Sequence, residues 1–200
     1  MMIQSRDQEK ARGKLVIVSG PSGVGKSTIC REVVRRVKNA YLSVSVTTRA
    51  KAAREENGRE YWFISRDEFH RCIEKGALLE YAEVFGNSYG TPKDKTDEAL
   101  RAGKVVILEI DVQGGKQVKA LYPQAVMIFI LPPSAKVLGD RMGRRGRETA
   151  EAAVRRLGGA NAEIAAARQY YDNMVINDDL EQAISEVIRI IEHAPGIGDT

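Results

Sequence analysis

Eight consecutive residues, Gly20-Pro21-Ser22-Gly23-Val24-Gly25-Lys26-Ser27, match the P-loop pattern of a glycine, four free positions and Gly-Lys-Ser/Thr. The apolar run before it, residues 15–18, predicts a buried strand, and residues 27–34 after it predict a helix. Converging backbone N–H groups, the Lys26 charge and a helix N-terminus all favour an anion, and the Ser27 hydroxyl suits Mg²⁺. The motif in this context therefore predicts a polyphosphate site.

Short apolar runs alternate with helical patterns along the rest of the chain. Strands are expected at residues 14–19, 41–46, 104–110, 125–131 and 173–177. Helices are expected at residues 25–38, 92–102, 113–121, 134–145, 150–171 and 179–193. Because each parallel crossover needs a helix, this order predicts an α/β fold whose parallel sheet is flanked by helices on both faces.

Residues 47–91 interrupt the alternation and predict a small mixed α/β lobe with strands of its own. One helix of this lobe is expected to begin at Ser65, because Ser65 and Glu68 have the spacing of a capping box. The next helix is expected to have Thr91 as its cap and Pro92 at its first position.

The composition limits the class of protein but names no function. The chain has 200 residues, 43% of them hydrophobic, which is enough for one domain with a good core. A net charge of +4 suits nucleic acid or an enzyme of anionic nucleotides, and we favour the enzyme. Cys30 and Cys72 have no partner at ligand spacing, which indicates a reducing compartment and no thiolate metal site. Without a signal-peptide core or an apolar run of ~18 residues, the chain is expected in the cytoplasm, with no membrane partner.

Several further motifs follow the P-loop in a fixed order. They are Ser43-Val44-Ser45-Val46-Thr47-Thr48-Arg49; Glu55, Gly58 and Tyr61; Glu80-Tyr81-Ala82-Glu83-Val84-Phe85-Gly86-Asn87-Ser88-Tyr89-Gly90-Thr91; and Leu108-Glu109-Ile110-Asp111-Val112-Gln113-Gly114. With their gaps, these motifs resemble guanylate kinase from about residue 14 to about residue 190. The resemblance implies in-line transfer of the terminal phosphoryl group of ATP to GMP, giving ADP and GDP, with Mg²⁺ as cofactor.

The resemblance also implies roles for individual residues. The guanine is expected to lie among Ser45, Glu80, Thr91 and Asp111, and the GMP phosphate among Arg49, Tyr61 and Tyr89. ATP is expected to bind residues 20–28, from Gly20 to Thr28, and Asn177. Mg²⁺ is expected to bind Ser27, with Glu109 or Asp111 acting through water. The expected catalytic set is Lys26, Arg49, Arg141, Arg145 and Arg156, the last three closing over the triphosphate as a lid.

The chemistry of the side chains agrees with these roles. A carboxylate such as Glu80 can accept from the ring N–H and the exocyclic amine of guanine together, whereas adenine presents an unprotonated ring nitrogen. Arg49 offers a planar fork to a phosphate dianion, and tyrosine hydroxyls donate without adding charge. Taken singly, Tyr61 and Tyr89 also fit core aromatics and Glu80 a solvated strand residue, but the surrounding motifs favour binding.

One position departs from the family pattern, which usually has a second phosphate-binding arginine three residues after the first. Here the order is Arg49-Ala50-Lys51-Ala52, and the alanine cannot bind phosphate. Lys51 or Arg54 is near enough in the loop to replace the arginine, although a lysine gives no bidentate contact. GMP binding is therefore expected to persist, but to be weaker than usual or to use Arg54.

Two further segments remain open to other interpretations. A basic cluster consists of Arg141, Arg144, Arg145 and Arg147. It fits a mobile lid, a solvated helix end or a nucleic-acid-binding patch. We favour the lid and expect no nucleic-acid partner. Asn177-Asp178-Asp179 fits the family's turn near adenine, or merely the cap of the last helix.

We expect a single guanylate-kinase-like domain, residues 14–193, between a flexible extension, 1–13, and a loose tail, 194–200. The expected core comprises residues 14–46, 92–137 and 157–193. The expected GMP-binding lobe comprises residues 47–91, and the expected lid comprises residues 138–156. One alternative is a non-catalytic module for phosphorylated peptides, which the intact Lys26 and Ser27 oppose. Another is a kinase of a phosphorylated sugar, which Ala52 suggests. ATP and GMP are the expected partners, and the sequence leaves open whether the chain forms a homo-oligomer.

Overall fold

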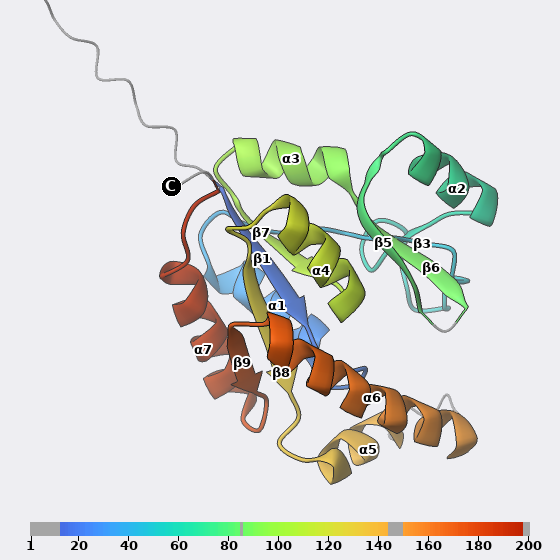
Figure 1. Cartoon of the computed structure of the whole chain (residues 1–200), viewed down its shortest axis with the longest axis vertical. Helices are drawn as coiled ribbons and strands as arrows, with labels where there is room; N and C mark the ends of the chain where they lie inside the picture. The colour runs from blue at the N-terminus through green and yellow to red at the C-terminus, as the bar shows by residue number, and fades with distance from the viewer. Residues whose placement is uncertain (1–12, 85, 144–149, 198–200) are drawn as a thin grey trace, which may run out of the picture.

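A five-stranded parallel sheet forms the centre of the molecule (Figure 1). The computed structural model describes residues 13–84, 86–143 and 150–197; the side chains of residues 142, 143 and 150–157 are outside this description. The strands lie in the order β2 (Ala40–Leu42), β7 (Val105–Glu109), β1 (Lys14–Ser19), β8 (Val126–Leu131) and β9 (Asn173–Ile176). Every neighbouring pair is parallel, as the alternation of strands and helices predicts.

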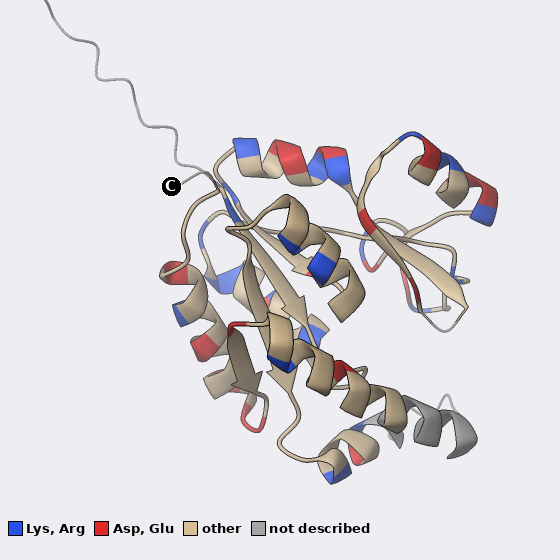
Figure 2. Ribbon diagram, viewed as in Figure 1, with Lys and Arg blue, Asp and Glu red and all other residues tan. Residues whose placement is uncertain are grey.

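Helices cover both faces of this sheet. On β1, Val16 and Val18 face the apolar cluster that includes α1 (Lys26–Arg36) and α7 (Leu180–Glu192). Leu15 and Ile17 alternate with them and face the cluster that includes α3 (Lys93–Arg101), α4 (Val112–Leu121) and the C-terminal part of α6 (Ala150–Tyr170). Because both faces are buried, the central strands need continuous apolar sequences, and Figure 2 shows the charged residues mainly on helices and loops.

A second sheet, which we call the small sheet, has the order β4 (Trp62–Phe63), β3 (Val46–Thr47), β6 (Asn87–Pro92) and β5 (Leu78–Val84). Phe69 of α2 (Arg66–Glu74) is buried and lies close to Gly90 of β6. The predicted capping box is confirmed, since Ser65 Oγ accepts from the Glu68 N–H and the Glu68 carboxylate accepts from the Ser65 N–H. The small sheet occupies the region of the expected lobe; the division into core, lobe and lid stays a prediction.

The link between the two sheets corrects one predicted strand. The single strand expected at residues 41–46 is in fact two strands, β2 in the central sheet and β3 in the small sheet. The chain changes sheets between Ser43, whose N–H donates to Ile107 O, and Ser45, whose carbonyl accepts from the Trp62 N–H. The other predicted strands and helices are confirmed, with ends that differ by at most two residues. The helix expected at 134–145 is α5 (Ala135–Gly143), and residues 144–145 lie outside the described part.

The start of α3 also differs from the prediction. Thr91 does not cap this helix, because its hydroxyl donates to Glu80 Oε1 at 2.6 Å. Pro92 is the N-cap instead, without a side-chain hydrogen bond, and its carbonyl accepts from the Thr96 hydroxyl at 3.0 Å. The threonine that the sequence pattern assigns to a helix cap is therefore used to hold a buried carboxylate.

Candidate active site

The P-loop connects β1 to α1. Gly20 has a φ of 149°, and a Cβ at this position would lie 2.5 Å from Ile130 O, so a larger residue would collide with β8. Gly25 is the N-cap of α1, with a φ of 107° and no side-chain cap. The N–H groups in the first turn of α1 therefore have no capping side chain, which favours an anion at this helix end. Lys26 Nζ donates to the carbonyls of Gly20 and Pro21.

A cavity of about 290 Å³ separates the P-loop from the small sheet. The P-loop contributes Gly20, Ser22, Gly23, Gly25, Lys26 and Ser27 to its lining. The opposite side is formed by Ser45, Tyr61, Glu80, Ala82, Val84 and Tyr89. Glu109, Ile110 and Asp111, which follow one another from the end of β7, and Glu163 of α6 complete it. The cavity thus brings together most of the residues that the sequence predicts for ATP and for GMP.

Ser27 and Glu109 form a corner of this cavity that suits a hard cation. Ser27 Oγ donates to Glu109 Oε1 at 2.6 Å. The Asp111 carboxylate accepts from the Gly114 N–H at 2.8 Å and so caps α4. Within the described ranges, no three Asp, Glu, His or Cys side chains converge as a metal cluster. A hydroxyl and one carboxylate fit Mg²⁺, which keeps several waters and takes further oxygens from phosphates.

Glu80 is a buried carboxylate on the small-sheet side of the cavity, and only 4% of its surface is exposed. Burial raises the pKa of this carboxyl to about 7. The hydrogen bond from Thr91 opposes the rise, and the charge of Asp111 adds to it. The alternative that Glu80 is a solvated strand residue is therefore wrong.

The residues expected to hold the GMP phosphate lie together beside the cavity. The two guanidinium N–H groups of Arg49 donate to the two carboxylate oxygens of Glu55, at 2.8 and 3.0 Å. The guanidinium carbon of Arg49 lies 5.4 Å from the centre of the Tyr61 ring, and the Tyr61 and Tyr89 ring centres are 5.7 Å apart. Burial raises the pKa of the Tyr61 hydroxyl to about 12, which keeps it a neutral donor. The fork of Arg49 is thus bound to Glu55, next to two tyrosines that line the cavity.

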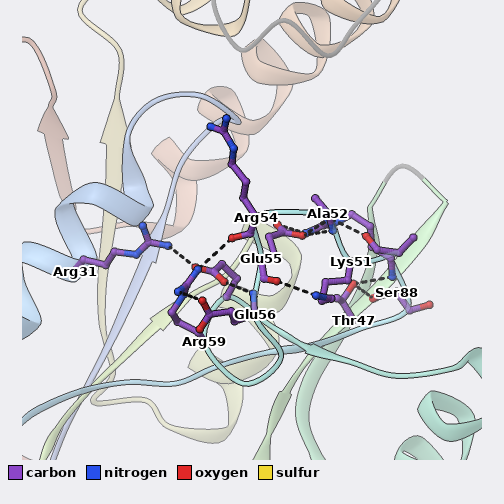
Figure 3. A network of polar contacts seen from close by, with 12 residues as sticks. Arg31, Thr47, Lys51, Ala52, Arg54, Glu55, Glu56, Arg59 and Ser88 are labelled. Carbon is purple, nitrogen blue, oxygen red and sulfur yellow. Dashed lines mark hydrogen bonds and ion pairs between the residues drawn. The ribbon is translucent and has the colours of Figure 1, made fainter.

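The loop after Arg49 contains the position of the missing arginine. Ala52 donates its backbone N–H to Glu55 Oε2 at 2.8 Å, and Lys51 Nζ donates to the Glu55 carbonyl at 3.1 Å. Figure 3 shows the Arg54 side chain extending away from this hydrogen-bonded network. Of the two candidate replacements, Lys51 is the one that contacts the residue paired with Arg49.

Arg141 and Asn177 both contact the backbone of the P-loop region. Asn177 is buried, and its side-chain amide donates to Val24 O at 2.7 Å. Arg141 donates two hydrogen bonds to Asn177 O, both at 3.1 Å, and one to Val24 O at 3.4 Å. Asp179, which accepts from the Gln182 N–H at 2.8 Å, is the cap of α7. The alternative that this turn caps the last helix is therefore confirmed for Asp179, while Asn177 supports the P-loop.

The other two arginines of the expected lid are not placed. Arg145 lies outside the described residues, together with Arg144 and Arg147. Arg156 is in α6, and its side chain belongs to the undescribed part of that helix. Their roles over the triphosphate remain predictions.

The sequence motifs predict neither Glu163 nor the hydrogen bonds by which Ser19 holds the backbone at Ile110 and Asp111. Glu163 lines the cavity from α6, and burial raises the pKa of its carboxyl, although the Lys26 charge opposes the rise. The Tyr171 hydroxyl donates to Ser19 Oγ at 2.6 Å, and Ser19 in turn donates to Ile110 O at 2.8 Å. No motif marks Glu163 in its alanine-rich helix, whereas the place of Ser19 directly before the P-loop was a usable signal.

Comparisons with known proteins agree with this geometry. The family model described as guanylate kinase matches residues 12–194. A guanylate kinase from Carboxydothermus hydrogenoformans is 47% identical over 180 residues, 90% of this chain and 88% of the relative. One from Rubrobacter xylanophilus is 47% identical over 188 residues, 94% of this chain and 98% of the relative. The crystal structure of guanylate kinase from Anaplasma phagocytophilum has a TM-score of 0.77 at 34% identity and covers 92% of this chain and 86% of that one. This chain belongs to the guanylate kinase family.

Proposed function

We propose that this chain transfers the terminal phosphoryl group of ATP to GMP, giving ADP and GDP, in the cavity between the P-loop and the small sheet. One observation carries the proposal: a complete P-loop faces a buried carboxylate, Glu80, across a single cavity. The P-loop suits a triphosphate, and Glu80 suits a base with two adjacent donors. Transfer between two nucleotides needs both ends of such a cavity at once.

Glu80 selects the acceptor base in this proposal. Its ionised carboxylate accepts from the ring N–H and the exocyclic amine of guanine, and Thr91 fixes one of its oxygens by a hydrogen bond of 2.6 Å. Adenine would place an unprotonated ring nitrogen against the carboxylate, so two acceptors would face each other without a proton. Ser45 and Asp111, which line the same cavity, complete the expected base site.

The donor nucleotide binds on the other side. The N–H groups of the P-loop and of the first turn of α1 hold the phosphates, and Lys26 exchanges its P-loop carbonyls for phosphate oxygens. Ser27 and Glu109 would hold Mg²⁺, Glu109 through water, and the ion would neutralise charge on the triphosphate when bound. Arg141, with Arg145 and Arg156 of the expected lid, adds positive charge as the site closes.

Arg49, Tyr61 and Tyr89 hold the acceptor phosphate. The planar fork of Arg49 now binds the Glu55 carboxylate through two hydrogen bonds, and a phosphate dianion has the same bidentate geometry. We expect the phosphate to share or replace Glu55 on this fork. Lys51 supplies a further charge in place of the arginine that the family usually has at position 52.

A single assay tests the function against its alternatives. ADP release is followed with ATP and Mg²⁺ while GMP, AMP and ribose phosphates are offered in turn as acceptors. Selective turnover of GMP supports the proposal, and selective turnover of a ribose phosphate would indicate the sugar-phosphate kinase that Ala52 suggests. Binding of nucleotides with no turnover of any acceptor would indicate a non-catalytic module.

The location and the macromolecular partners of the enzyme are separate from its reaction. Within the described part of the chain, no helix combines the length and the hydropathy that crossing a bilayer requires. A cytoplasmic location, the absence of a nucleic-acid partner and the oligomeric state stay predictions or open questions.

A further inference from the structure

Gly114 in the first turn of α4 lies directly against the carboxylate of Glu80. A Cβ added at Gly114 would lie 2.4 Å from Glu80 Oε2 and 2.9 Å from its carboxyl carbon. No side chain fits at these distances unless the carboxylate moves. The other carboxylate oxygen, Oε1, is fixed by Thr91, so the carboxylate is held between a hydroxyl and the bare backbone of α4.

A second contact joins the same helix to the residue after Glu80. The side-chain amide of Gln117 donates to Tyr81 O at 2.8 Å and its oxygen accepts from the Tyr81 N–H at 3.3 Å. β5 is an edge strand of the small sheet, so these Tyr81 groups would otherwise face away from the sheet without a strand partner. Gln117 therefore makes the two backbone hydrogen bonds that a neighbouring strand would make at Tyr81. These bonds join β5 to α4, which packs on the central sheet.

The β5–β6 pairing also changes register between Leu78 and Glu80. Such an irregularity re-aims the side chain that follows it and weakens the local pairing of the strand. Besides Thr91 of β6, the direction of Glu80 therefore depends on contacts from outside the small sheet, and the two contacts from α4 lie at Glu80 itself and at the next residue.

We propose that Gly114 and Gln117 are positioning residues that determine base specificity: α4 docks on β5 through the Gln117–Tyr81 pair and leaves, at Gly114, the space that the Glu80 carboxylate needs. This inference rests on the proposed function, because it assumes that Glu80 binds the acceptor base. Neither residue is expected to touch the nucleotide. Both act by holding the carboxylate, so their loss affects the choice of base and spares the ATP side.

Gly114→Ala and Gln117→Ala test the inference through kcat/KM for GMP and for AMP and the KM for ATP. For Gly114→Ala we expect kcat/KM for GMP to fall about 100-fold, because a displacement of about an ångström has effects of this size. The ratio of the GMP to the AMP value should fall with it, and the KM for ATP should stay within about twofold. Gln117→Ala, at an exposed position, should lower the ratio about three- to tenfold, since two neutral hydrogen bonds are lost.

Gln113→Ala is the control on the same helix. Gln113 lies in α4 one residue before Gly114, and its side chain is exposed. The substitution alters neither Gly114 nor Gln117, so the GMP-to-AMP ratio should be retained. Gln117→Glu is a further test variant: it keeps the size of the side chain and the acceptor for Tyr81 N–H but loses the donor, and should behave like Gln117→Ala.

Glu80→Gln separates the inference from the proposed function. If Glu80→Gln lowers the GMP-to-AMP ratio while Gly114→Ala and Gln117→Ala retain it, α4 does not position the carboxylate and the inference is wrong. If Glu80→Gln itself retains the ratio, Glu80 does not select the base and the inference loses its foundation. If Gly114→Ala fails to fold, the Gln117 variants carry the same test.

Discussion

The carboxyl of Glu80 is buried where a negative charge is disfavoured. An ordinary glutamate is ionised well below neutral pH, but burial raises the pKa of this carboxyl to about 7. A guanine ring and amine would offset that burial with two hydrogen bonds to the ionised form. The residue is therefore better suited to a bound base than to the stability of the empty protein, as is common in binding sites.

Glu80→Gln should consequently stabilise the empty protein in a pH-dependent way. The folded state binds the Glu80 proton more tightly than the unfolded state, whose pKa is near 4.5, so wild-type stability falls as the pH rises from about 4.5 to about 7. At 1.36 kcal/mol per pKa unit, the loss approaches about 3 kcal/mol above pH 7. Denaturant unfolding at pH 4 and pH 8 measures it: the gain from Glu80→Gln should be larger at pH 8 by this amount. An equal effect at both pH values would show that the carboxyl is not perturbed.

The loop from Arg49 to Glu55 is the element in which this chain differs from its family. Lys51 contacts the Glu55 carbonyl, whereas the Arg54 side chain extends away from the network (Figure 3). Lys51→Ala should raise the KM for GMP about three- to tenfold, the effect of one lost charge-assisted contact, and Arg54→Ala should change it less than about twofold. Ala52→Arg should lower this KM by restoring a bidentate donor. Steady-state kinetics with saturating ATP give these values, and if neither Lys51→Ala nor Arg54→Ala raises the KM, local compensation is the wrong account.

The P-loop depends on a turn far from it in sequence. Asn177, which follows β9, donates to Val24 O at 2.7 Å from a buried position, and a Cβ at Gly25 would lie 2.5 Å from its amide nitrogen. Asn177→Ala leaves the Val24 carbonyl without this donor, so we expect a loss of about 1–3 kcal/mol in unfolding free energy and a raised KM for ATP. Asp178→Ala, at the exposed neighbouring position, is the control in thermal unfolding and kinetics. Unchanged KM and stability in Asn177→Ala would contradict the supporting role.

Elements with a strong local signal were predictable from the sequence, and contacts between distant elements were not. The P-loop, the apolar strand at 105–109 and the Ser65 capping box each have a pattern that local chemistry dictates. The sequence pattern predicts Thr91 as a helix cap because a threonine before a proline suits that position, but its partner is Glu80, which the pairing of β5 with β6 brings beside it. Glu163 had no signal, and Gly114 was marked only as the end of a motif without a role, since the importance of both depends on which elements the fold brings beside the cavity.

On the scale of the whole molecule, the small sheet lies beside the central sheet (Figure 1), and the P-loop lies across the cavity from it. The chain passes from β2 to β3 and returns from β6 through α3 to β7, and α4 contacts β5 at Tyr81. In the proposed function, the donor would bind at the P-loop end of the central sheet and the acceptor at the small sheet, and closure of the two would bring the reacting phosphates in line. The account therefore requires that one cavity holds both nucleotides together.

A bisubstrate inhibitor, with adenosine and guanosine joined through their phosphates, tests this requirement most directly. Its inhibition is measured in the ADP-release assay with ATP varied at fixed GMP and with GMP varied at fixed ATP. The account predicts competition against both substrates, because the compound fills the P-loop and the Glu80 site at once. Competition against only one substrate, or equal inhibition by a compound that carries adenosine at both ends, would contradict it.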